Sequence, residues 1–282
     1  MVAVSEVLVD VDTLAASSAT VLDASWLYPP MNTAGVDVRA RYAAAHLPRS
    51  IFLDLAALSP PRPGAPDLPA IAPPTPATVH AVLARLGLGV DATLVVTDQE
   101  GGIATAPFAR LALLDAGCTN VRLLDGGTPA WAAAGRPLTA ERPRVAATRA
   151  PGEALSTGRF MGTRATRAAV ADPAAMVVDA RVVTGNAGLL PARYADVAIP
   201  ADAVLRPGEV VAERAEGGRF HDPATLRALA AHRGLLDARA VLVTCHFGVG
   251  AAVVATALEI AGRADVRVDA ASILGWAQPA KG

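Results

Sequence analysis

Short apolar runs alternate with longer segments of helical character along the whole chain. The short runs predict strands over residues 20–23, 94–97, 121–125, 176–179, 240–244 and 266–269. The longer segments predict helices over residues 77–88, 103–116, 223–232 and 249–261. Short, fully apolar strands that alternate with helices are typical of a parallel sheet with helices on both faces. The pattern therefore predicts the α/β class.

The same pattern occurs twice. Residues 93–104 (TLVVTDQEGGIA) and 240–251 (AVLVTCHFGVGA) each combine an apolar run that ends in Thr, a glycine-bearing loop and an apolar helical segment. Two copies at so long a period indicate a duplicated domain, because solenoids need three or more short units. We expect a first domain over residues 1–140, a linker over 141–162 and a second domain over 163–282. The proline-dense segment 59–76 predicts an irregular connection.

The composition narrows the class of protein. Of the 282 residues, 52% are apolar and 18% are charged, which excludes a disordered chain. The formal net charge of -1 argues against nucleic acid or an anionic membrane as a partner. Two cysteines without metal-ligand spacing exclude a disulfide scaffold and a structural zinc site, so no metal is expected.

Export and membrane insertion are not expected either. The most apolar segment, residues 248–261, contains Glu259 and is shorter than the roughly 20 residues that span a bilayer. The acidic N-terminal segment lacks the basic start of a signal peptide. We therefore expect a cytoplasmic protein whose two thiols stay reduced.

One loop carries candidate chemistry. Cys245 follows the predicted strand 240–244 and precedes a predicted helix, with a short loop between them: His246, Phe247, Gly248, Val249 and Gly250. Ligands of parallel sheets bind at the carboxyl ends of strands. The glycines allow backbone N–H groups to converge, and a helix N-terminus adds partial positive charge. We therefore expect Cys245 to have a lowered pKa and to act as a nucleophile.

The sequence resembles the two-domain rhodaneses, sulfurtransferases that act on thiosulfate or 3-mercaptopyruvate. The resemblance covers nearly the whole chain and rests on these motifs: VLDASW (21–26), AHLPRSIFLDL (45–55), LLDGGTPAW (123–131), VVDAR (177–181) and CHFGVGA (245–251). It implies two tandem rhodanese-like domains, with Asp98 at the first domain's cysteine position. It also implies a ping-pong reaction in which Cys245 carries a persulfide to cyanide or a thiol, without a cofactor.

The sequence departs from the family at the expected donor site. Thiosulfate-type members usually have Arg and Lys after the cysteine, and mercaptopyruvate-type members usually have Gly and a small residue, whereas this chain has His246 and Phe247. An anion-binding arginine is missing from the segment TGNAG (184–188). Arg181 and Arg193 are candidate substitutes. The backbone of residues 246–250 is expected to bind the substrate by holding the negative charge of the outer sulfur. The sequence leaves the sulfur donor open.

Other functions and other residue roles compete with the sulfurtransferase interpretation. A cysteine phosphatase, which shares this fold, is excluded, because it needs an arginine six positions after its cysteine and Ala251 stands there. A catalytically weak or inactive binding or regulatory protein stays possible, because site residues change on a conserved fold. His246 either lowers the pKa of the Cys245 thiol or contributes only its backbone. Cys118 lacks a glycine loop and is expected to be structural.

Overall fold

The first half of the chain builds a five-stranded parallel sheet. The computed structural model describes residues 4–27, 34–59, 74–148, 152, 155–181, 194, 197–212 and 218–277. The strands of the first sheet are β1 (Leu8–Val9), β2 (Thr20–Asp23), β3 (Ser50–Phe52), β4 (Leu94–Thr97) and β5 (Val121–Leu124). They are ordered β1-β5-β4-β2-β3, and every pairing is parallel. The predicted strands 20–23, 94–97 and 121–125 are confirmed, the last one residue shorter.

The second half repeats this topology. Its strands are β6 (Phe160–Met161), β7 (Ala175–Asp179), β8 (Ala203–Val204), β9 (Ala240–Thr244) and β10 (Val266–Asp269). Their order is β6-β10-β9-β7-β8, again entirely parallel. Each strand thus has a counterpart at the same place in the first sheet, as the sequence repeat predicts. The predicted strands 176–179, 240–244 and 266–269 are confirmed.

The strands that the pattern missed are the edge strands of the two sheets, β1, β3, β6 and β8. Each has only two or three residues, too few to show a period. Phe160 and Met161, at the end of the segment that we interpreted as a linker, form β6. The division of the chain at residues 140 and 162 remains a prediction.

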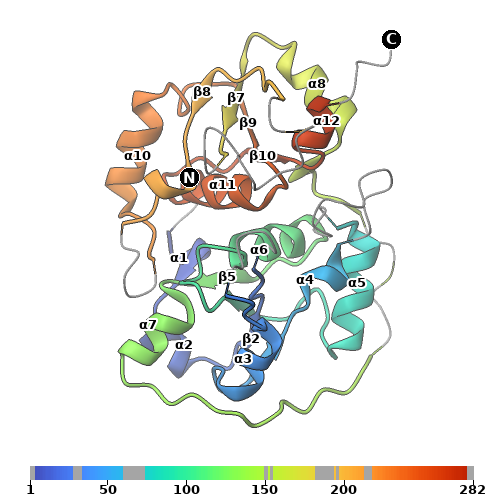
Figure 1. Cartoon of the computed structure of the whole chain (residues 1–282), viewed down its shortest axis with the longest axis vertical. Helices are drawn as coiled ribbons and strands as arrows, with labels where there is room; N and C mark the ends of the chain where they lie inside the picture. Colours follow the sequence, from blue (N-terminus) through green and yellow to red (C-terminus); the bar gives the residue numbers. More distant parts are fainter. Residues whose placement is uncertain are drawn as a thin grey trace.

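Helices cover both faces of each sheet (Figure 1). The helices of the first half are α1 (Val4–Val7), α2 (Val11–Ala16), α3 (Val38–Ala44), α4 (Leu55–Leu58), α5 (Pro76–Arg85), α6 (Ala106–Asp115) and α7 (Gly127–Ala133). Those of the second half are α8 (Thr163–Val170), the 3-10 helix η2 (Pro207–Glu209), α10 (Pro223–His232), α11 (Val249–Ile260) and α12 (Ile273–Ala277). The predicted helices correspond to α5, α6, α10 and α11.

The alternation of side chains along the strands explains the two covered faces. In the first sheet, Val21 and Val95 pack in one cluster with Leu14 of α2 and Trp131 of α7. Their neighbours Leu22 and Val96 point to the opposite face, in the cluster that contains α5 and α6. Strands buried on both faces must be apolar at every position, which is why they were visible in the sequence.

The two halves share one core. The buried cluster that contains α6 continues into α11 of the second half, and these two helices lie side by side at the centre of Figure 1. A buried ion pair joins them, with Arg110 Nη1 2.6 Å from Glu259 Oε2. At the opposite end of β5, Arg219 of the second half pairs with Asp125, which directly follows the strand, at 2.9 Å. The carboxyl edge of the first sheet is therefore in contact with the second half.

The remaining predictions concern the proline-dense segment and membrane insertion. Most of the proline-dense segment 59–76 lies outside the described residues. Across the part of the chain that the structure describes, no helix has the length and apolar character needed to cross a membrane.

Candidate active site

The candidate nucleophile lies at the carboxyl end of a central strand. Cys245 directly follows β9 and is 3% exposed. The backbone N–H of Gly248 donates to its Sγ over 3.1 Å. Gly248 has φ +92° and precedes α11, a conformation that costs other residues energy. A Cβ on Gly250 would lie 3.1 Å from the carbonyl oxygen of Ala180. Both glycines therefore allow the chain to fold tightly around the sulfur.

The environment of the thiol differs from the sequence expectation. Burial raises the pKa of Cys245, and the negative charge of Asp269 adds to the rise. The backbone N–H groups of Ala251, Phe247 and Gly248 favour the thiolate and act in the opposite direction. The expected lowered pKa is thus wrong for the free thiol, because removal from water outweighs the converging donors.

His246 is neutral at physiological pH. Burial and the nearby positive charge of Arg181 lower the pKa of its imidazole to about 4, although Asp179 acts in the opposite direction. Its Nε2 is buried and has no hydrogen-bond partner. A neutral imidazole provides no positive charge to stabilise a thiolate. A neutral His246 therefore does not lower the pKa of the Cys245 thiol by its charge, which leaves the alternative that only its backbone contributes.

The other candidate binding residues with side chains are Arg181, Phe247 and Arg193. Arg181 faces Asp179, donating from Nε over 3.0 and 2.9 Å and from Nη2 over 2.6 Å. It also donates to the carbonyl of Val197 over 3.1 Å. Most of its donors are therefore already used within the protein. Phe247 is buried in the loop, 5.9 Å from the His246 ring centre. Arg193 lies outside the described residues, as does the segment 184–188.

The first half contains the same kind of loop with a different occupant. Asp98 follows β4 as Cys245 follows β9, and its carboxylate is fully buried. Five backbone N–H groups donate to it over 2.8 to 3.1 Å, from Glu100, Gly102, Ala104, Thr105 and Ala106. This explains why α6 begins at Ala106 and not at the predicted residue 103, since the preceding amides bind the carboxylate. The loop after the central strand is thus built to hold an anion.

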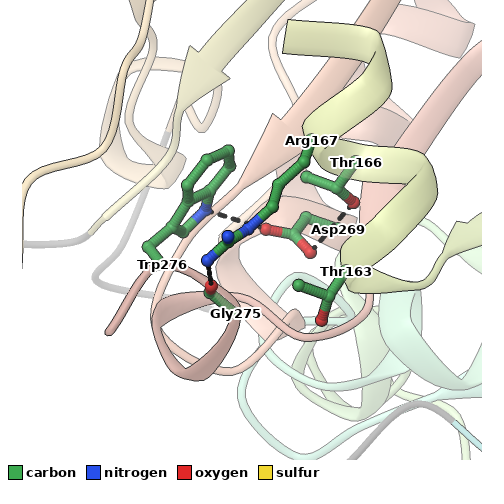
Figure 2. A pocket seen from close by; sticks show the side chains of 6 residues that line it. All are labelled: Thr163, Thr166, Arg167, Asp269, Gly275 and Trp276. Carbon is green, nitrogen blue, oxygen red and sulfur yellow. Dashed lines mark hydrogen bonds between the residues drawn. The ribbon is translucent and has the colours of Figure 1, made fainter. Parts of the chain in front are cut away.

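Behind Cys245, a second buried carboxylate connects three elements. Asp269 at the end of β10 accepts from Thr244 Oγ1 at 2.9 Å and from Trp276 Nε1 at 3.0 Å. Thr166 of α8 donates to its other oxygen at 3.3 Å (Figure 2). The space among these side chains is too small for a ligand. Asp269 therefore fixes Thr244, the residue before Cys245, and both of its carboxylate oxygens accept hydrogen bonds from within the protein.

Sequence reasoning did not assign a role to Asp269. The available signal was the repeat itself. An aspartate occurs at the strand end in both copies, with Asp125 directly after one strand and Asp269 as the last residue of the other. A charged residue that recurs at a buried strand end indicates a hydrogen-bonded role. No group of three or more metal-binding side chains occurs within the described part of the chain.

A tandem α/β fold with a cysteine in a glycine loop after a central strand defines a class, the tandem rhodanese-like proteins. Comparison with known proteins agrees. Residues 23–134 match the rhodanese-like domain. "Putative thiosulfate sulfurtransferase SseB" of Mycobacterium tuberculosis is 31% identical over 258 residues, covering 88% of this chain and 84% of that protein. The chain belongs to the rhodanese family of sulfurtransferases.

Solved structures show the same architecture. SseA of Escherichia coli, described as a 3-mercaptopyruvate sulfotransferase, superposes with a TM-score of 0.77 at 25% identity, covering 94% of this chain and 98% of that one. A sulfur transferase subunit of yeast mitochondrial complex I reaches 0.78 at 24% identity, covering 98% and 97%. The predicted fold, two tandem rhodanese-like domains, is confirmed. The names of two of these relatives give different donors, thiosulfate for SseB and 3-mercaptopyruvate for SseA.

Proposed function

We propose that this sulfurtransferase moves a sulfane sulfur from thiosulfate or 3-mercaptopyruvate to cyanide or a thiol through a persulfide on Cys245. We also propose that it does so in the cytoplasm, without a cofactor. Both cysteines are free thiols, as this chemistry requires. The proposal deepens the family assignment by naming the nucleophile and the donors.

The transfer would proceed in two balanced steps. The Cys245 thiolate attacks the outer sulfur of thiosulfate, an S–S bond forms, and sulfite leaves with the electron pair of the broken bond. With 3-mercaptopyruvate, the C–S bond breaks instead, and the enolate of pyruvate leaves and takes up a proton. In the second step the acceptor attacks the outer sulfur and the Cys245 thiolate is released.

The observation that carries the proposal is the anion-binding geometry of the paired loop. Five amides of the first half hold the Asp98 carboxylate, at the position that corresponds to Cys245 in the second half. In the second half, the donors that favour the thiolate come from Phe247, Gly248 and Ala251. We infer that these amides stabilise the negative outer sulfur of the persulfide, as an oxyanion hole stabilises an oxygen.

Among the residues that the structure describes, the donor site would be poor in free positive charge. Arg181 is paired with Asp179, and His246 is neutral. Thiosulfate, a dianion, would gain little from such a site, because strong anion binding needs charged donors with free N–H groups. A monoanionic donor such as 3-mercaptopyruvate loses less. We therefore expect 3-mercaptopyruvate to react with the protein at a lower concentration than thiosulfate does.

The decisive experiment measures the intact mass of the protein after incubation with each donor, and again after addition of cyanide. We expect a gain of one sulfur atom that cyanide removes. Cys245→Ser is expected to gain none, whereas Cys118→Ser, which leaves the loop intact, is expected to gain sulfur as the wild type does. Loss of the gain in Cys118→Ser but not in Cys245→Ser would contradict the proposal.

The competing function is a binding or regulatory protein without transfer activity. The raised pKa of Cys245 is the observation that favours it. It predicts no mass gain with either donor. A sulfur gain on Cys245 rules it out.

A further inference from the structure

A charged carboxylate is buried at the base of the candidate active-site loop. Asp269 is 1% exposed and accepts from Thr244 Oγ1 over 2.9 Å, from Trp276 Nε1 over 3.0 Å and from Thr166 Oγ1 over 3.3 Å (Figure 2). These three side-chain donors are neutral. Arg167 lines the same pocket, but it donates to a backbone carbonyl over 2.8 Å and makes no ion pair with Asp269. The network thus fixes the carboxylate without cancelling its charge.

The first half has an apolar side chain at the same place. Extending the register of the paired strands places Asp269 of β10 opposite Thr244 of β9. In the first sheet it places Leu124 of β5 opposite Thr97 of β4. Leu124 is buried in an apolar cluster, and Thr97 Oγ1 donates to the carbonyl of Asp98 over 3.4 Å. The fold itself therefore does not need a carboxylate at this position.

The two positions differ as the loops beside them differ. A buried carboxylate costs free energy, because its charge is removed from water. The half that bears this cost is the one whose loop holds Cys245. In the other half, a carboxylate in place of Leu124 would repel the buried charge of Asp98, just as Asp269 repels negative charge on Cys245. The position is therefore matched to the occupant of the loop.

The other charged groups around the Cys245 loop are paired with one another or neutral. After β7, Asp179 pairs with Arg181 at 2.6 Å. In η2, Glu209 pairs with Arg233 at 2.5 Å. His246, in the loop itself, is neutral. Among the described groups near the loop, Asp269 is thus the ionised side chain whose charge no ion pair offsets.

We propose that Asp269 is a positioning residue for sulfur transfer, which fixes Cys245 through Thr244 and whose negative charge keeps free Cys245 in its unreactive thiol form between transfers. The inference rests on the proposed function and adds a residue to it. Burial, the larger cause, and the charge of Asp269 both raise the pKa of Cys245. Because only the thiolate reacts, a free cysteine held in this way is protected from electrophiles other than its donor.

The first test measures the effect of the charge without any sulfur donor. In a Cys118→Ser background, the rate of alkylation by iodoacetamide from pH 6 to pH 10 gives the pH at which half of Cys245 is thiolate. We expect Asp269→Asn, which keeps an acceptor oxygen for Thr244, to lower this midpoint by about half a pH unit or more. Alkylation at pH 7 then becomes about threefold faster or more. A merely loosened loop would change the rate at high pH and leave the midpoint in place.

Two further variants complete this test. Asp237→Asn is the matched control, because Asp237 is exposed and precedes the amino end of β9, so its midpoint should equal that of the parent. Asp269→Leu replaces Asp269→Asn if the latter does not fold, since the first half carries Leu124 at this position. An unchanged midpoint in the folded variant of Asp269 overturns the proposal.

The second test separates the hydrogen bond from the charge. Thr244→Val removes the bond to Asp269 and leaves the carboxylate in place. We expect its alkylation midpoint to stay at the parent value, while the rate of sulfur loading, followed by intact mass, falls about threefold or more. Loading at the parent rate would overturn the positioning role. If the wild type gains no sulfur from either donor, the proposed function fails, and the alkylation midpoint still decides whether the charge of Asp269 acts on Cys245.

Discussion

At the scale of single residues, two buried side chains in equivalent loops differ in how many backbone amides donate hydrogen bonds to them. Asp98 is fully buried, yet five amides compensate its charge. Cys245 is buried as well, but Gly248 is the amide that donates within hydrogen-bond distance of its sulfur. A carboxylate projects further from the backbone than a thiol and spreads its charge over two oxygens. An added outer sulfur would extend the Cys245 side chain toward the same donors.

The raised pKa of Cys245 predicts the pH dependence of its reactivity. Only the thiolate reacts, and below the pKa its fraction rises about tenfold per pH unit. In Cys118→Ser, we expect the rate of alkylation by iodoacetamide to increase in this way from pH 6 to pH 8. A rate that levels off below pH 8 would mean a lowered pKa. In Cys245→Ser the remaining thiol is Cys118, and burial raises its pKa to about 11, so its alkylation rate should also keep rising up to pH 8.

At the scale of elements, the loop between β9 and α11 has no spare room. Gly250 faces the carbonyl oxygen of Ala180 and the ring of Pro207, which a Cβ would approach to 3.1 and 3.3 Å. Ala180 follows β7, and Pro207 begins η2. The backbone around Cys245 is therefore fixed by contacts with two other elements, as a preorganised site requires.

Gly250→Ala is expected to disturb this packing. Overpacking of a tight site typically costs about 1–3 kcal/mol, and displacement of the loop would also reduce sulfur loading. Urea unfolding measures the first effect, and the mass gain after donor treatment measures the second. Gly152→Ala is the control, because a Cβ there meets open space. Unchanged stability and loading in Gly250→Ala would show that the loop is loosely held.

The elements also mark how far the sequence alone could predict the molecule. The central strands were predicted because burial on both faces forces every residue to be apolar, as in β4 and β9. The edge strands β1 and β8 have two residues each, and their pairing depends on partners far along the chain. Local pattern contains no information about such partners.

The candidate site was predictable to a similar degree. Cys245 was found because strand, glycine loop and helix are local features. The pairing of Arg181 with Asp179, which reduces its value as an anion ligand, was not. The pKa of Cys245 was predicted in the wrong direction, because burial depends on the whole fold and not on the loop. The hydrogen bonds of Asp269 were also missed, since they come from three separate elements.

At the scale of the whole molecule, the two halves meet through a continuous core and an ion-pair triad. Glu259 accepts from Arg110 and Arg159, and its own side chain is 3% exposed. Burial lowers the pKa of Arg110, and the Glu259 carboxylate acts against this and keeps the guanidinium charged. A core shared by α6 and α11 is expected to make the halves unfold together.

Glu259→Gln is expected to destabilise the whole chain. It leaves the buried Arg110 without its counter-charge, which typically costs about 3–5 kcal/mol. The free energy of urea unfolding measures this loss. Asp12→Asn breaks an exposed pair with Arg136 and should cost less than about 1 kcal/mol. Equal stability of the two variants would show that the triad does not hold the halves together.

Under the proposed mechanism, the carboxylate of Asp98 also limits how many sulfur atoms one chain can hold. All five of the loop's converging amides are committed to a group that belongs to the chain itself. At this position the first loop offers no thiol to accept a transferred sulfur, and the amides that would stabilise one already bind the Asp98 carboxylate. Under the proposed mechanism, one polypeptide stores one sulfur atom. On that mechanism, duplication produced a second domain without adding a second position for a transferred sulfur.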